Sequence, residues 1–187
     1  MKRATIIICV LFVFLSGCNV RQHRHMRIMD STKEYVLRNE ELIRDAAEWL
    51  ISHYSQLEDV GGYDTIYIER NDTNQIYAKN YTTEQTEIVK NDACETLLLN
   101  DKFFKSITIH STEDCQTVEF NVKGIGNNAY YNVVFVPSGN IEDVWFYDSR
   151  FTYTGLDDGF LGTQVDGDNS FFYLPLFDNL FYCESYF

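Results

Sequence analysis

Residues 31–57, STKEYVLRNEELIRDAAEWLISHYSQL, carry the clearest helical pattern in the chain. Apolar side chains recur there at steps of seven, four, three, four and three residues, which places them on one face of a helix. These residues are Val36, Ile43, Ala47, Leu50, Tyr54 and Leu57. Ser31 and Glu34 have the spacing of a capping box at the start of this helix, and Gly61 with Gly62 predicts its end. We therefore expect an amphipathic helix that buries one face against the rest of the chain.

Beyond the two glycines the hydrophobic period changes from 3.6 to 2, as is typical of strands. The predicted strands are residues 65–69, 75–81, 104–110, 116–123, 130–136, 144–153, 171–174 and 181–183. Between them, Thr82 and Gln85 have the spacing of a second capping box, which favours a short helix within residues 82–100.

This order of elements predicts a single α+β domain. Its long N-terminal helix packs on a curved, mainly antiparallel sheet of about seven or eight strands. In the order of its elements the domain is similar to cystatin-like and nuclear-transport-factor-like cones.

Upstream of the helix, residues 1–18 read MKRATIIICVLFVFLSGC, with a basic start, an apolar run over residues 6–15 and a Leu15-Ser16-Gly17-Cys18 end. This layout resembles the lipobox signal peptide of bacterial lipoproteins. The resemblance implies cleavage between Gly17 and Cys18, a diacylglyceryl group on the sulfur of Cys18, and a domain outside the cytoplasm. The alternative is a transmembrane helix, which needs about 20 apolar residues. Here the apolar run is interrupted by Ser16 and Gly17.

The predicted organisation therefore has three parts. Residues 1–17 are the signal peptide, residues 18–29 are the lipidated cysteine and a basic tether, and residues 30–187 are the α+β domain. Each buried methylene contributes about 0.8 kcal/mol, so two or three acyl chains hold a protein firmly. We expect a protein lipid-anchored to the bacterial cell membrane or outer membrane.

The charge of the domain restricts its partners. From Asp30 onward the chain has ten basic and 28 acidic residues, a net charge of −18. A surface this negative repels phosphate backbones and excludes nucleic acid as an expected partner. It suits either simple solubility or a basic protein partner.

Three of the five cysteines remain once Cys9 leaves with the signal peptide and Cys18 is lipidated. Cys94 and Cys115 are a candidate disulfide in an oxidising compartment, closing a loop of roughly 20 residues. Equally, Cys94, Cys115 and Cys183 can all be small buried hydrophobes. The sequence has no Cys-x-x-Cys and no Cys/His cluster with metal spacing, so neither a metal nor a cofactor is predicted.

Two groups of residues are candidate sites. The first is an aromatic sheet surface for partner or sugar recognition, with the alternative that these rings are covered as core: Tyr130, Trp145, Tyr147 and Tyr153. The second is a connection crowded with catalytic residue types, His110, Ser111, Glu113, Asp114 and Cys115. It matches no recognised catalytic motif. Two further features have structural interpretations. The acidic loop at residues 166–169 is predicted to be a turn and not a calcium site. Trp49 and His53 are predicted to flank the core.

We therefore expect a non-enzymatic, lipid-anchored envelope protein of unknown activity. Its acidic, aromatic surface fits a binding module of inhibitor or immunity type with a basic partner. The alternative is a small ligand-binding or hydrolytic cone with a pocket between helix and sheet.

Overall fold

The computed structural model describes residues 2–57, 65–80, 86–111, 116–122, 129–143, 151–156, 159–164 and 169–186. Side chains are described from Met26 onward, except those of residues 151, 153 and 160. The helical elements are α1 (Lys2–Ser52), α2 (Tyr54–Leu57), α3 (Asp92–Glu95), the π-helical turn η2 (Thr96–Asn100) and the 3-10 turn η3 (Ile141–Asp143).

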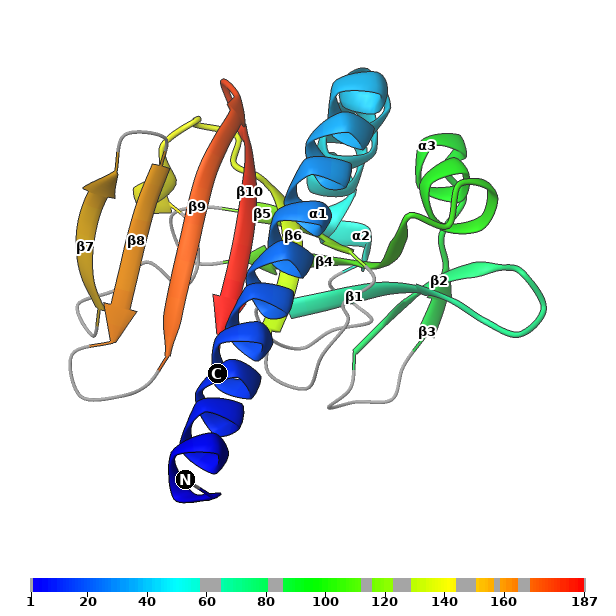
Figure 1. Ribbon diagram of the computed structural model, residues 1–187. Helices are drawn as coiled ribbons and strands as arrows, with labels where there is room; N and C mark the ends of the chain where they lie inside the picture. Colours follow the sequence, from blue (N-terminus) through cyan, green and yellow to red (C-terminus); the bar gives the residue numbers. More distant parts are fainter. Residues whose placement is uncertain are drawn as a thin grey trace.

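The strands form one antiparallel sheet in the described part of the chain. They are β1 (Thr65–Arg70), β2 (Ile76–Lys79), β3 (Thr86–Ile88), β4 (Phe104–Ser111), β5 (Gln116–Val122), β6 (Ala129–Phe135), β7 (Phe151–Leu156), β8 (Gly159–Gln164), β9 (Ser170–Phe177) and β10 (Leu180–Tyr186). Their order in the sheet is β3-β2-β1-β4-β5-β6-β10-β9-β8-β7. The sheet is strongly twisted, since β7 to β9 run steeply in Figure 1 whereas β1 runs nearly across it.

The predicted α+β class is confirmed, but the prediction of seven or eight strands is wrong because the sheet has ten. The short strand β3 lies in the stretch for which the sequence predicts a helix, and β8 lies between the predicted strands 144–153 and 171–174. Gly159 is needed at the start of β8, since a Cβ atom there would lie 2.0 Å from the carbonyl oxygen of Tyr173 on β9. A glycine of this kind lets two neighbouring strands approach closely, but in the sequence alone a glycine usually indicates a turn.

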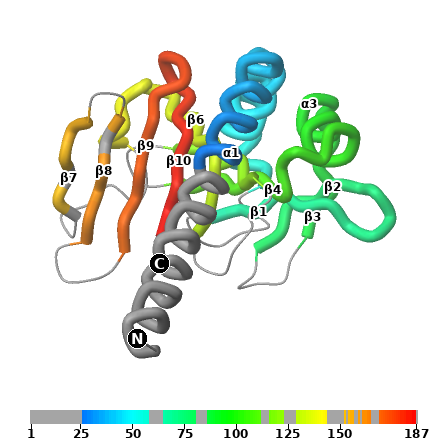
Figure 2. Tube along the Cα trace, in the orientation of Figure 1, coloured from blue at the N-terminus to red at the C-terminus, as the bar shows by residue number. Residues whose placement is uncertain are grey.

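Helix α1 crosses one face of the sheet and contacts β5, β6 and β10, with α3 beside it on the same side (Figures 1 and 2). The predicted apolar stripe is confirmed. Its members are buried against the sheet in the main core: Val36, Ile43, Ala47, Leu50, Tyr54 and Leu57. The sheet supplies the other half of this core with side chains such as Ile66, Ile107 and Phe120.

The first predicted capping box does not mark a helix start. At Ser31 the helix is already under way, and the Ser31 hydroxyl donates to the carbonyl oxygen of Ile28 at 2.9 Å. The second predicted box, at Thr82 and Gln85, lies outside the described residues. The short helix predicted in that stretch is α3, and it is capped by Asn91, whose Oδ1 accepts from the backbone N–H of Cys94 at 2.9 Å.

Contacts between α1 and the sheet begin just before residue 30, the position at which the sequence predicts the start of the domain. Ile28 and Met29 on α1 already pack against a smaller cluster on the sheet, formed by Ala129, Tyr131, Leu174 and Tyr182. Among the described residues, no helix is long and apolar enough to cross a bilayer.

An aromatic contact fixes α1 to the segment after η2. The ring of Tyr35 stacks on Phe103 with centroids 4.0 Å apart, and its hydroxyl donates to Asp101 Oδ2 at 2.6 Å. Burial, together with the neighbouring carboxylate, raises the pKa of Tyr35 above its ordinary value. This hydrogen bond therefore persists through the physiological pH range.

Cys94 and Cys183 are buried free thiols. Burial raises the pKa of Cys94 to about 12 and raises that of Cys183 as well. In the reduced native protein at pH 8 we expect neither thiol to react with iodoacetamide, because the thiolate is the reactive form. Both should be alkylated after denaturation, and peptide mass spectrometry would score each site. Equal labelling before and after denaturation would contradict their burial. Cys115 lies outside the described residues. Because Cys94 is a free thiol in this structure, the Cys94–Cys115 pairing stays a prediction for the oxidised protein.

Candidate functional site

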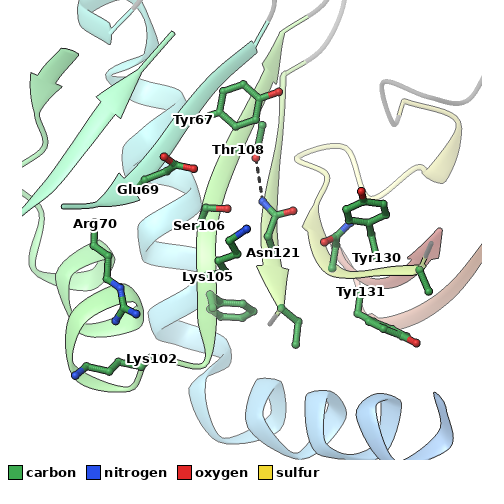
Figure 3. Close-up of a pocket in the computed structure, with 14 residues that line it drawn as sticks. Tyr67, Glu69, Arg70, Lys102, Lys105, Ser106, Thr108, Asn121, Tyr130 and Tyr131 are labelled. Atoms are coloured by element: carbon green, nitrogen blue, oxygen red, sulfur yellow. Dashed lines mark hydrogen bonds between the residues drawn. The ribbon is translucent and has the colours of Figure 1, made fainter. Parts of the chain in front are cut away.

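A pocket of about 740 Å³ lies over β1, β4, β5 and β6, and its polar lining is mainly on the sheet face opposite α1 (Figure 3). The lining also includes residues that pack in the clusters on the α1 side: Phe104, Val122, Ala129 and Tyr131. Strand alternation puts the polar lining opposite α1: Ile66 and Ile68 of β1 enter the main core, so Tyr67 and Glu69 point to the other face. In the same way Val118 and Phe120 of β5 enter the core and Asn121 turns to the pocket. The volume is within the range of ~300–1,000 Å³ that is usual for ligand pockets.

The polar lining of the pocket is ordered by hydrogen bonds across strands. Asn121 Nδ2 donates to Thr108 Oγ1 at 2.9 Å, which joins β5 to β4. Figure 3 shows the amide oxygen of Asn121 pointing toward the side of the pocket where Tyr130 lies. Tyr130 on β6 is 56% exposed, so its ring is available to a ligand. The site thus combines a fixed amide with an accessible aromatic ring.

Beside the pocket, on the same sheet face, a buried hydrogen-bond network joins four strands. His110 Nε2 lies 2.9 Å from Glu119 Oε2, and His110 Nδ1 lies 3.4 Å from Thr65 Oγ1. Asn132, which also lines the pocket, donates its Nδ2 to the second oxygen of Glu119. His110, Glu119 and Asn132 are each less than a tenth exposed. The network therefore orders the face on which the pocket lies.

The crowded connection proposed from the sequence is only partly described. Residues 112–115, including Glu113, Asp114 and Cys115, lie outside the described residues. His110 is oriented by Glu119, a residue that the sequence reasoning missed. The signal was present, because Thr117, Glu119 and Asn121 alternate with Val118 and Phe120 and put a polar row on one face of β5.

The charged lining of the pocket is mainly positive. Arg70 ends β1, Lys102 precedes β4 and Lys105 lies on β4, while Glu69 is the single acidic residue of the lining. Tyr77 on β2 donates its hydroxyl to Glu69 Oε2 at 3.5 Å, and burial with the Glu69 charge raises the pKa of Tyr77. Lys102 has a left-handed backbone with φ of 55°, a conformation that is uncommon for residues other than glycine.

The predicted aromatic surface is described only in part, so it stays a prediction. Tyr130 lines the pocket, whereas Tyr153 belongs to β7, four strands away in the sheet order. At about 4.8 Å per strand this separation is roughly 19 Å. Trp145 and Tyr147 lie outside the described residues, and the side chains of Cys18 and Tyr153 are not described.

Other predicted features have structural roles or fall outside the description. Trp49 and His53 stack with ring centroids 4.2 Å apart at the edge of the helix-side core. Asp166, Gly167 and Asp168 of the acidic loop lie outside the described residues. Within the described ranges, no group of three or more His, Cys, Asp or Glu residues could hold a metal ion.

The cone alternative requires a pocket between helix and sheet, whereas the polar lining of the described pocket faces away from α1. Close-packed side chains fill that layer, among them Leu50, Leu97 and Phe120, each essentially inaccessible. The chain matches no protein-family model, no curated protein and no solved structure. Its function is therefore inferred from the pocket and from the N-terminal sequence.

Proposed function

We propose that this chain is a lipid-anchored binding protein of a bacterial envelope. The lipobox-like residues 15–18 support lipid attachment at Cys18. Ile28 and Met29 are the first described residues that pack against the sheet, ten and eleven positions after Cys18. A cleaved and lipidated chain would therefore hold its folded domain close to the membrane surface.

The pocket over β1, β4, β5 and β6 carries the binding part of the proposal. The pocket is large enough for a small ligand. The amide of Asn121 is held in place by its hydrogen bond to Thr108, and the exposed ring of Tyr130 lies beside it. The neighbouring acid–base pair, His110 and Glu119, is buried and engaged with Asn132 and Thr65. We infer from this arrangement that the pocket recognises a ligand and that its function is binding.

A fragment screen by two-dimensional NMR tests the location of the site. We expect small polar fragments to shift backbone amides around Thr108, Asn121 and Tyr130, because concave sites with preordered polar groups collect such ligands. The Asn121→Ala and Tyr130→Ala variants should weaken these shifts. Shifts confined to the outer face of α1, or none at the pocket, would contradict the proposal.

A basic protein partner is the second candidate, and it would use a different surface. Exposed carboxylates follow one outer face of α1 at steps of seven, four and three residues: Glu34, Glu41, Asp45 and Glu48. Binding of a cationic protein to this face should weaken as ionic strength rises, since exposed charges are screened by salt. Affinity that is unchanged by salt, or by the Glu41→Gln and Glu48→Gln changes, would exclude this surface.

A further inference from the structure

The geometry points to an anionic sugar or polyol as the ligand of this pocket, with Arg70, Lys102 and Lys105 holding its phosphate or carboxylate. This inference rests on the proposed binding role and goes on to name the chemical class of the ligand. The anion would lie at the cationic end of the pocket. The hydroxyl groups would face the polar lining and Tyr130.

Charge is the first argument. The domain has 28 acidic and only ten basic residues, yet three of the four charged side chains in the pocket lining are basic. The neighbouring carboxylate of Asp101 is not part of the lining, because it accepts a hydrogen bond from the Tyr35 hydroxyl on the helix side. The pocket is thus a locally positive site on a strongly negative protein. Such a site attracts an anion while the rest of the surface repels it.

The second argument is that basic side chains from separate segments meet in the pocket. The three cations come from two separate segments, the end of β1 and the start of β4, and Arg70 and Lys102 reach the same end of the pocket in Figure 3. A guanidinium group binds phosphate or carboxylate through two parallel N–H donors, and an ammonium group adds a compact charge. Lys102 is also placed by a left-handed backbone, where asparagine or glycine would be less strained.

The third argument concerns the uncharged part of the lining. Asn121 and Thr108 are fixed by their mutual hydrogen bond, and Ser106 and Asn132 add further hydroxyl and amide groups. Tyr67 and Tyr130 supply aromatic rings. Amides and hydroxyls recognise hydroxyl groups, and ring faces cover the C–H surfaces of a sugar. A purely inorganic anion would leave this part of the pocket unused.

Isothermal titration of the full-length protein in detergent tests the inference with glucose 6-phosphate, glucose and inorganic phosphate as probes. We expect glucose 6-phosphate to bind more tightly than either of the others, with affinity that falls as salt rises. The combined variant Arg70→Gln, Lys102→Asn and Lys105→Gln should weaken this binding by at least about tenfold. The matched control Lys90→Gln removes an exposed lysine outside the pocket and should leave the affinity unchanged.

Misfolding is a poor explanation for weaker binding, because asparagine tolerates the backbone of residue 102 better than lysine does. An unchanged thermal midpoint of the combined variant would verify this. Equal affinity for glucose and glucose 6-phosphate, or no binding of glucose 6-phosphate, overturns the anionic ligand class. Equal affinity for inorganic phosphate and glucose 6-phosphate overturns the inference that the ligand carries a sugar or polyol. The binding role itself fails separately, if the fragment screen finds nothing at the pocket.

Discussion

The Phe120→Ala variant should lose about 3–5 kcal/mol of unfolding free energy, the usual cost of truncating a buried phenylalanine. Phe120 is fully buried on β5 beneath α1, and its ring centroid lies 5.3 Å from that of Phe104 on β4. Truncation leaves a cavity between helix and sheet, where neighbouring side chains lose contacts that they cannot recover by small movements. Urea denaturation, followed by circular dichroism, would measure the change as a lower midpoint.

The control for this variant is Tyr130→Ala on the adjacent strand. Tyr130 is also aromatic, but it is 56% exposed and faces the pocket. Its truncation should change the unfolding free energy by no more than about 0.5 kcal/mol, as for most surface substitutions. Similar losses in the two variants would mean that the core does not lie on the α1 side of the sheet.

The Glu119→Ala variant should lose about 3 kcal/mol, although it removes no apolar side chain. The substitution leaves His110 Nε2 and the Asn132 amide without the carboxylate that they both contact. A buried polar group deprived of its partner costs roughly 1–3 kcal/mol, and two such groups are affected here. Because Asn132 also lines the pocket, ligand affinity should fall together with stability.

Two further variants separate the network from charge in general. Glu119→Gln keeps an acceptor for Asn132 and a polar group beside His110, so it should recover part of the lost stability. Glu87→Ala removes an exposed carboxylate from the edge strand β3 and should have almost no effect. If Glu119→Ala were as mild as Glu87→Ala, the network would have no structural role.

The strands of the central sheet could be predicted from the sequence because they are rich in β-branched and aromatic residues, and β1 and β2 also alternate between buried and more exposed positions. The hairpin of β1 and β2 and the meander of β4, β5 and β6 lie within a few residues of their predicted ranges. The helix stripe was equally clear, since its residues are buried without exception. In these elements local pattern and tertiary burial agree.

Other elements could not be predicted because tertiary contacts decide them. Strand β8 depends on the close approach of Gly159 to β9, whereas glycine in the sequence signals a turn. The start of α1 was misplaced because a serine with a glutamate three residues later has the same spacing inside a helix as at its beginning.

The site was predicted only in fragments. Tyr130 was identified as a surface aromatic residue and His110 as a polar residue of interest, and the structure places them on neighbouring parts of one sheet face. The pocket itself combines residues from β1, β4, β5 and β6, which lie far apart along the chain. Their proximity follows from the strand order, which alternation alone does not specify.

Lipid anchoring at Cys18 is the premise on which the proposed location of this protein depends. Mass spectrometry of the N-terminal peptide from membrane-extracted protein tests it most directly. We predict a peptide that begins at Cys18 and carries the added mass of a diacylglyceryl group, and a Cys18→Ala variant that keeps residues 1–17 and the sequence MKRATIIICVLFVFLSG. An unmodified Cys18 in a membrane-bound chain that still begins at Met1 would contradict the account.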